Sequence, residues 1–268
     1  MIIIQGTSKG FFGLVGDTTR HISQCIEKNE EWFIDWGEET LYYDKEQGNN
    51  AWEYYFKQTF DYKPTNNYVR DYTKLTLLKD NSFRKTMNYI HSNYVILNDK
   101  TNEMLEPHFQ LFDNNKVLGV HIRRTDKFLV GAYGTTPSQV PVDLEFFRKE
   151  IDNIIDSYDL IFLATDCSDT CKYMKDIYGK KLIFNRNTVR GKESISIHNN
   201  FKNVSGYIKG LDVVTDTYLL SRCQHLIRST SNVSMYSLFI NSNLTYLNVN
   251  EKYLNDHSED ELLRDIIS

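Results

Sequence analysis

The sequence predicts an α/β fold with parallel sheets, and three observations carry that prediction. In the second half of the chain, apolar runs of strand length alternate with stretches whose apolar residues recur at helical spacing. One of those runs, 117–122, ends abruptly in charged residues. The chain also opens with a short apolar run and a glycine-rich segment, as a βαβ unit does. Strands that alternate with helices in this way form parallel sheets covered on both faces.

The first half begins in this pattern and then loses its periodicity. Its expected segments are a strand at 2–4, a glycine-rich turn at 6–16, a helix at 17–29, a strand at 33–36, an irregular aromatic region at 44–70, a helical region at 71–97 and a linker at 98–115. Asp17 or Thr18 is the expected N-cap of the first helix. We therefore expect two domains, 1–110 and 111–268.

The second half is regular throughout. Strands are expected at 117–122, 160–164, 182–184, 225–227 and 244–249, and helices at 143–157, 169–178, 210–221 and 233–240. This order predicts a Rossmann-like sheet that holds its ligand outside the carboxyl ends of its strands.

Composition and charge narrow the classes of function. The formal net charge of −5 argues against a general nucleic-acid binder, which needs clustered Lys and Arg. The N-terminus lacks the basic and apolar regions of a signal peptide, and no run approaches the ~20 apolar residues of a membrane span. We expect a cytoplasmic protein, and peripheral contact with a membrane stays open. The four cysteines are too few and scattered for a disulfide framework.

Two adjacent arginines stand where the run 117–122 ends. A planar guanidinium matches two phosphate oxygens at once, so arginines at such an edge are typical of phosphate recognition. Arg123 and Arg124, with His121 and Asp126 beside them, therefore predict a pyrophosphate or nucleotide-sugar site. The alternatives are a solvated strand end for the arginines and a core position for His121.

Three further clusters fall at strand ends or helix starts. Asp166 can accept hydrogen bonds from a base or ribose, or it can cap the following helix. Asp212 and Asp216 lie one turn apart on an expected helix, where solvated carboxylates are the alternative. The segment 228–234 offers hydroxyls, backbone N–H groups and a helix dipole to a phosphate, with a plain capping box as the alternative. In this order on alternating strands, the four clusters together favour the pyrophosphate or nucleotide-sugar site.

At these residues the chain resembles a known family. His121-Ile-Arg-Arg-Thr-Asp126 is similar to the His-x-Arg-Arg-x-Asp signature of the metal-independent fucosyltransferases that use GDP-fucose. That group includes α-1,6- and α-1,2-fucosyltransferases, a rhizobial chitin-oligosaccharide fucosyltransferase and protein O-fucosyltransferases. Thr125 and Lys127 make the match most similar to the α-1,6 branch. Segments 163–166 and 215–234 resemble the second and third motifs of that branch, although Cys167 stands where its second acidic residue often lies.

The resemblance implies a GT-B fold, in which two Rossmann-like parallel-sheet domains face each other across a cleft. The C-terminal domain would bind the GDP-sugar and the N-terminal domain the acceptor. By this resemblance Arg123 would hold the diphosphate and the charge of the leaving group, Arg124 would assist, and Asp126 would orient both. The implied donor-binding residues are His121, Arg123, Arg124, Asp166, Asp216, Ser229, Thr230, Ser231 and Asn232.

The implied reaction is inverting, metal-independent transfer of L-fucose from GDP-fucose to a hydroxyl of a glycan or glycolipid acceptor. Such transfer needs fixed cations or a metal ion at the leaving group. The chain has two arginines and no Asp-x-Asp motif, so we expect no metal and no cofactor besides the donor substrate. The alternatives are another GDP-hexose as donor, or an inactive module that binds a nucleotide or glycan.

Two points stay open at this stage. The segment 128–133 lacks the carboxylate that follows the motif in the α-1,6 branch, so the general base remains undecided among Asp17, Asp35, Glu145 and His121. The aromatic residues near Trp36 and at 52–56 are either platforms for sugar rings or ordinary core, and the second interpretation is favoured.

Overall fold

The chain forms two compact units, each built on one parallel sheet. The computed structural model describes residues 1–70, 73–78, 82–125, 141–186, 188–192 and 203–254. Unit 1 comprises 1–106, 203–214 and 238–242, and unit 2 comprises 107–202, 215–237 and 243–268. The two parallel sheets confirm the predicted α/β class. The division into an acceptor-side domain 1–110 and a GDP-sugar-binding domain 111–268 remains a prediction.

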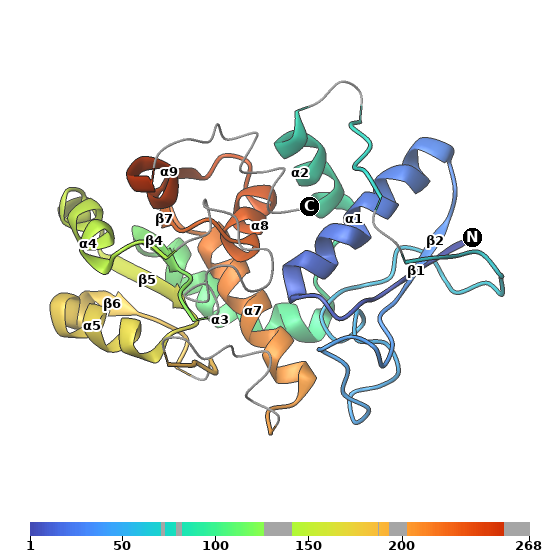
Figure 1. Cartoon of the computed structure of the whole chain (residues 1–268), viewed down its shortest axis with the longest axis horizontal. Helices are drawn as coiled ribbons and strands as arrows, with labels where there is room; N and C mark the ends of the chain where they lie inside the picture. Colours follow the sequence, from blue (N-terminus) through green and yellow to red (C-terminus); the bar gives the residue numbers. More distant parts are fainter. Residues whose placement is uncertain (71–72, 79–81, 126–140, 187, 193–202, 255–268) are drawn as a thin grey trace. The chain divides into compact units, whose positions relative to one another are not determined.

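Helices and strands alternate along most of the described chain (Figure 1). The strands are β1 (Ile2–Gln5), β2 (Trp32–Asp35), β3 (Tyr68–Val69), β4 (Val117–Ile122), β5 (Leu160–Thr165), β6 (Leu182–Ile183), β7 (His225–Arg228) and β8 (Thr245–Asn248). The helices are α1 (Phe11–Lys28), α2 (Phe83–Tyr94), α3 (Asp99–Asp113), α4 (Leu144–Asp152), α5 (Ser168–Tyr178), α7 (Gly206–Ser221), α8 (Asn232–Ile240) and α9 (Val249–Leu254), with 3₁₀ turns η3 (Ile155–Ser157) and η4 (Gly179–Lys181).

Unit 1 opens with the predicted strand and helix, but the helix begins earlier than expected. Its sheet has the order β2-β1-β3, and all its pairs are parallel. Helix α1 starts directly after Gly10, so the predicted turn covers only 6–10, and the predicted N-cap at Asp17 or Thr18 is wrong. Interior glycines cost a helix roughly 0.5–1 kcal/mol each. Burial of Phe11, Phe12 and other apolar side chains, at about 1.5–3 kcal/mol apiece, outweighs that cost.

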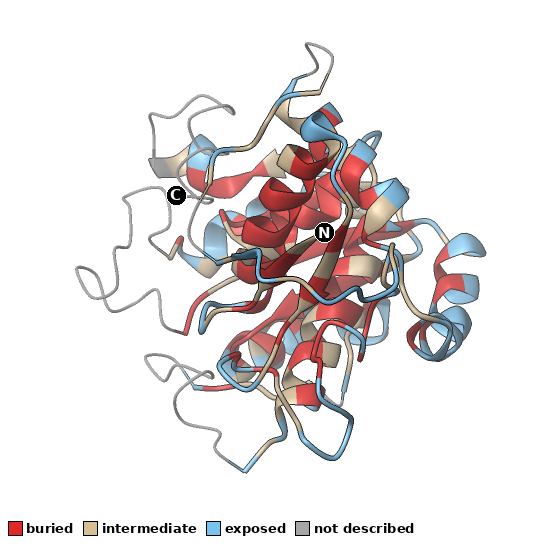
Figure 2. Cartoon of the chain, turned by 90° about the vertical axis from the view of Figure 1, so that its right-hand side faces the viewer, coloured by how far each residue is buried: buried red, intermediate tan, exposed pale blue. Residues whose placement is uncertain are grey.

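The aromatic residues of unit 1 make its core. The Phe11 ring meets the rings of Trp36, Tyr42 and Tyr55 edge-on, at centroid distances of 5.6, 4.9 and 5.1 Å. Trp36, Trp52 and Tyr55 are completely buried, so they are not platforms for a sugar ring. Figure 2 shows the buried residues concentrated along the strands and on the inner faces of the helices.

The segment expected to link the halves is helical. Helix α3 covers 99–113 and includes Pro107. Leu105, Phe109 and Phe112 are buried at helical spacing, which gives the segment an apolar stripe despite its Asp, Asn and Pro content. The expected helical region at 71–97 is shorter, because α2 begins only at Phe83.

Unit 2 has the predicted Rossmann-like sheet. Its five strands are all parallel in the order β6-β5-β4-β7-β8. The chain proceeds outward from β4 through β5 to β6, and then continues on the other side of β4 with β7 and β8. The order therefore reverses between β4 and β7, where an open parallel sheet leaves its ligand crevice.

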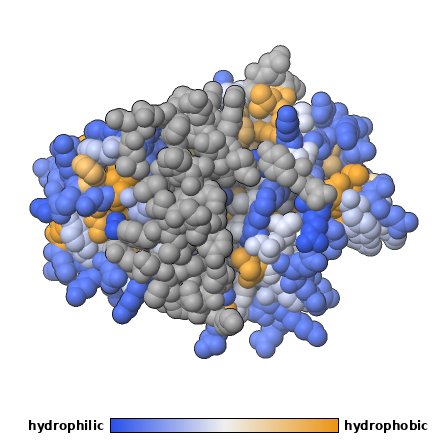
Figure 3. All heavy atoms as spheres, in the orientation of Figure 1, coloured by the Kyte–Doolittle hydropathy of each residue, from blue (hydrophilic) through white to orange (hydrophobic). Residues whose placement is uncertain are grey.

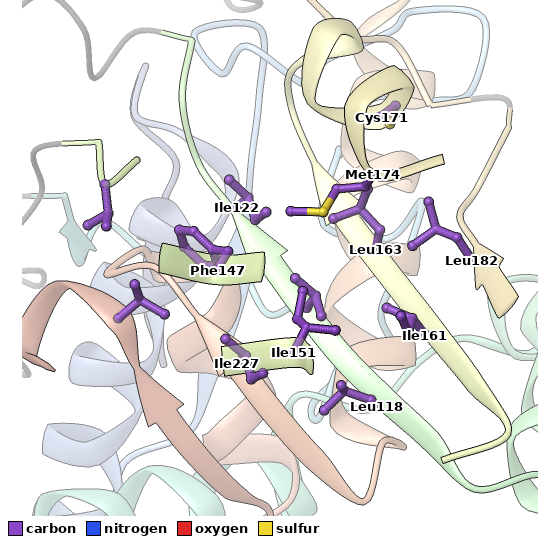
Figure 4. Packing of buried hydrophobic residues seen from close by; sticks show 13 residues of the cluster. Leu118, Ile122, Phe147, Ile151, Ile161, Leu163, Cys171, Met174, Leu182 and Ile227 are labelled. Carbon is purple, nitrogen blue, oxygen red and sulfur yellow. The ribbon is translucent and has the colours of Figure 1, made fainter. Parts of the chain in front are cut away.

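Helices α4 and α5 seal the core of unit 2. Phe147 and Ile151 of α4 pack over the β4 strand, and Met174 of α5 lies beside Ile122 and Leu163 (Figure 4). All six residues of β4 are buried, as its continuous apolar sequence predicts for a central strand. This core fixes the positions of the strand ends.

The face shown in Figure 3 carries only small, separate apolar areas in the described part of the chain. Among the described residues, no helix has both the length and the apolar character that crossing a bilayer requires.

Candidate functional site

Three strands of unit 2 end in register at the crevice. His121 of β4 pairs with Ala164 of β5 on one side and with Arg228 of β7 on the other. The residues that follow each strand are therefore neighbours at the carboxyl edge. Arg123 and Arg124 come after β4, Asp166 after β5, and Ser229 after β7. The sequence placed these residues at strand ends, and the parallel register brings them together.

Asp166 organises the segment after β4. One of its oxygens, Oδ1, accepts the Arg124 backbone N–H at 2.9 Å. The other, Oδ2, accepts the Thr125 hydroxyl at 2.6 Å and pairs with Nη1 of Arg123 at 2.9 Å. The Asp166 side chain is 7% exposed and that of Arg123 is 19% exposed. The arginine is therefore oriented by a buried carboxylate, while its side chain stays partly exposed.

Ser229 bridges the two strands on either side of the crevice. Its hydroxyl accepts the Arg123 backbone N–H at 2.9 Å, and its own N–H donates to the His121 carbonyl at 2.9 Å. The Ser229 hydroxyl also lies 3.4 Å from Nδ1 of His121. Burial, together with the charges of Arg123 and Arg228, lowers the pKa of His121 to about 3. His121 is therefore neutral near pH 7.

Two more arginines stand at this edge, and both are buried. Nη1 of Arg124 donates to the Val142 carbonyl at 3.1 Å. Nη1 of Arg228 donates to the Ser234 hydroxyl at 3.1 Å, and that hydroxyl donates to the Ser229 carbonyl at 2.8 Å. Their charges add to that of Arg123, whose side chain is the more accessible, so the edge attracts anions.

Helix α8 begins directly after the same loop. The Met235 N–H donates to the Ser231 carbonyl, which is the first hydrogen bond of the helix. The N–H groups of Asn232, Val233 and Ser234 precede that bond and have no carbonyl partner within the helix. Such a helix start binds anions through its N–H groups and its dipole.

Two asparagines that the sequence did not single out support this loop. Oδ1 of Asn250 accepts the Thr230 N–H at 2.9 Å, and the Asn248 side chain bonds the Thr230 hydroxyl. Asn248 also accepts the Asn250 N–H at 3.2 Å. All three residues are buried. The Thr230 backbone N–H thus donates to a protein group. Ser231, at the start of the helix, is half-buried and lies nearer to solvent.

The remaining predicted site residues lie as follows. Asp126 falls outside the described residues. Asp216 is buried on α7, and its charge contributes to a raised pKa of about 11 for Cys171, which burial mainly causes. Asp212 is buried one turn earlier on the same helix, so neither carboxylate has the solvated position considered as an alternative. The roles assigned to these residues stay predictions.

The four candidate bases have different surroundings. Asp17 pairs with Lys9 at 2.8 Å and Arg20 at 3.5 Å. Glu145 is exposed and accepts the Tyr173 hydroxyl. Asp35 ends β2 in unit 1, and burial followed by the charge of Glu53 raises its pKa. A raised pKa suits a carboxylate for accepting a proton near neutrality.

Within the described ranges, no three His, Cys, Asp or Glu side chains gather as a metal site would require. All four cysteines are buried as free thiols. The groups that the crevice does offer are a partly accessible arginine, two supporting arginines, hydroxyls and a helix start. Together they can bind a diphosphate and stabilise negative charge that develops on it.

The solved structures similar to this chain include NodZ and POFUT1. A NodZ α-1,6-fucosyltransferase soaked with GDP-fucose matches with a TM-score of 0.58 at 15% identity, over 89% of this chain and 92% of that one. NodZ from Bradyrhizobium in selenomethionine form matches with a TM-score of 0.61 at 15% identity, over 88% and 90%. POFUT1 in complex with GDP matches with a TM-score of 0.52 at 9% identity, over 92% and 97%.

No family model and no curated protein matches the sequence. The similarity therefore concerns the fold: the α/β chain, with one parallel sheet in each unit, has the GT-B fold of these fucosyltransferases.

Proposed function

We propose that the protein transfers L-fucose from GDP-fucose to a hydroxyl group of a glycan acceptor, with inversion and without a metal ion. The observation that carries this proposal is the position of Arg123 at the reversal of strand order between β4 and β7. There its N–H is bound by Ser229 and its guanidinium by Asp166. The similar NodZ and POFUT1 structures include complexes with GDP-fucose and with GDP.

The chemistry follows from where the charges stand. When the bond between fucose and the β-phosphate breaks, negative charge develops on GDP and must be stabilised. The guanidinium of Arg123 donates to the diphosphate oxygens, and the N–H groups at the start of α8 bind the same anion. Arg124 and Arg228 add positive charge from buried positions. Asp166 keeps Arg123 oriented before the donor arrives, which lowers the cost of reorganisation in the transition state.

Residues 1–110 would bind the acceptor. The acceptor hydroxyl must lose a proton as it attacks. The candidates for the base that accepts this proton are Asp17, Asp35, Glu145 and His121. Low pKa and burial make His121 the weakest of these as a base at neutral pH. A glycan or glycolipid precursor in the cytoplasm would be a suitable acceptor.

The first experiment measures GDP release from GDP-fucose with EDTA present, for the wild type and for Arg123→Ala. We expect release by the wild type and a loss of at least about a hundredfold in the variant, the scale typical of removing a transition-state donor. Arg222→Ala is the matched control, because Arg222 is an exposed arginine of the same unit paired with Asp113. It should leave the rate unchanged.

Other outcomes separate the alternatives. GDP binding by calorimetry without any release, even with acceptor mixtures, would indicate a nucleotide-binding module. Faster turnover of another GDP-hexose would keep the reaction class and change the donor. The fucosyltransferase proposal fails if the wild type neither binds GDP nor releases it from GDP-fucose.

A further inference from the structure

Arg190 has no role in the site as described so far, and its contacts lead to that site. It lies between β6 and α7, at the carboxyl edge of the unit 2 sheet. Its guanidinium donates to three backbone carbonyls: Nε to Thr165 at 3.2 Å, Nη1 to Thr188 at 3.2 Å and Nη2 to Asn185 at 2.8 Å. The same guanidinium lies over the Phe184 ring at 5.2 Å. One side chain therefore ties its own segment to the end of β5.

The next residue extends this attachment to Asp166. The Gly191 N–H donates to the Asp166 carbonyl at 2.9 Å, and the Gly191 carbonyl accepts the Ser168 N–H at 2.9 Å. Gly191 thus pairs with Cys167 as a parallel bridge beyond the end of β5. The backbone of Asp166 is held on this side, while its carboxylate holds Arg123, Arg124 and Thr125 on the other.

The geometry points to Arg190 as a positioning residue for the donor site, acting through Asp166 on Arg123. This inference rests on the proposed function for its effect on catalysis. Three of the five N–H donors of Arg190 are directed at carbonyls, which fits a structural fork better than a contact with phosphate. Lysine carries the same charge but cannot reproduce that fork.

The alternative role for Arg190 is a further cation that binds the diphosphate directly. Two variants separate the roles. Arg190→Lys keeps the charge and removes the fork, and Arg190→Met removes both. If Arg190 positions Asp166, both variants lose kcat for GDP release by about tenfold to a hundredfold, the scale of a misplaced catalytic group. If Arg190 acts by charge alone, Arg190→Lys keeps most of the activity and the positioning role is wrong.

Arg186→Lys and Arg186→Met are the matched controls, since Arg186 is an exposed arginine of the same segment. They should leave kcat and GDP affinity unchanged. Thermal unfolding is followed for every variant, and activity is measured well below the unfolding midpoint. A lower midpoint with unchanged kcat would reduce Arg190 to a role in stability and would overturn the inference.

A measurement without donor keeps this test independent of the proposed function. An Nη1–H signal of Arg123, assigned by its loss in Arg123→Lys, reports by NMR on the ion pair that Nη1 forms with Asp166. We expect this proton to exchange with water several-fold faster in both Arg190 variants and at the wild-type rate in the Arg186 variants. Unchanged exchange would overturn positioning. Changed exchange in a protein that never releases GDP would uphold positioning and refute the transferase.

Discussion

Asp166 is the residue on which the proposed donor site depends most. A buried carboxylate is stable only when charged or polar partners satisfy it. Here the partners are the guanidinium of Arg123, the N–H of Arg124 and the hydroxyl of Thr125, all from the segment after β4. The sequence predicts either a hydrogen bond from a base or ribose to Asp166, or capping of the following helix by its side chain. Its described partners hold the segment after β4, and its contact with a nucleotide stays a prediction.

Asp166→Asn should therefore lower both stability and donor affinity. The variant keeps the shape of the side chain but leaves Arg123 without its charged partner, and breaking a buried pair typically costs about 3 kcal/mol. Urea unfolding measures the loss of stability, and calorimetry measures the weaker binding of GDP.

Asp113→Asn is the control at the same scale. Asp113 pairs with Arg222 at 3.1 Å, but both side chains are largely exposed. Exposed pairs of this kind contribute about 0–1 kcal/mol. Equal losses in the two variants would mean that burial does not strengthen the Asp166 pair.

At the scale of elements, the strands were easier to predict than the helix boundaries. The run at 117–122 gave β4 with its correct ends, because a central strand buried on both faces has a continuous apolar sequence. The start of α1 and the whole of α3 were missed, since glycine and proline signals pointed to a turn and a linker. Burial of aromatic and aliphatic side chains outweighed those local preferences.

The same distinction holds for the candidate site. Arg123, Asp166 and Ser229 could be predicted to meet, because each follows a parallel strand and parallel strands end at one edge. Asn250 and Arg190 could not, because their contacts depend on how the segment after β8 or β6 folds back on its neighbour. A single asparagine in a short helix such as α9, or a single arginine in a loop, carries no periodic signal in the sequence.

In helix α7, helix propensity and side-chain packing predict opposite signs for the change in stability caused by Gly210→Ala. A Cβ atom at Gly210 would lie 2.5 Å from Cζ of Tyr55 and 3.0 Å from Cε2 of Phe11. Gly210→Ala would favour the helix by about 1 kcal/mol if propensity alone mattered. We expect it to destabilise the protein by about 1–3 kcal/mol instead, because the ring of Tyr55 is buried and cannot move freely.

Chemical denaturation of Gly210→Ala and the wild type measures the sign of this change in stability. Tyr55→Phe removes the hydroxyl oxygen nearest to the added methyl group, although it also loses a hydrogen bond of 2.9 Å to the Tyr207 carbonyl. Gly210→Ala should therefore cost less in the Tyr55→Phe background than in the wild type. A stabilising effect of Gly210→Ala alone would show that the contact is relieved easily.

At the scale of the whole molecule, each unit contains a histidine whose pKa is lowered in the folded protein. His91 of α2 lies in unit 1 and His121 of β4 in unit 2. Burial lowers the pKa of each to about 3, from an ordinary value of 6.5, and the charges of Arg123 and Arg228 contribute at His121. The unfolding free energy of both units is therefore expected to fall in acid, although each unit has its own sheet and core.

The sign of the pH dependence follows from proton binding. Between about pH 6.5 and pH 3 the unfolded chain binds a proton at each histidine that the folded chain does not, so stability falls as the pH falls. Each histidine contributes a slope of up to about 1.4 kcal/mol per pH unit in this range. We expect His91→Gln and His121→Gln each to flatten the wild-type dependence of unfolding free energy, measured by urea titration from pH 7 to pH 4. A wild-type slope that persists in the double variant would contradict the assignment of the acid sensitivity to these two histidines.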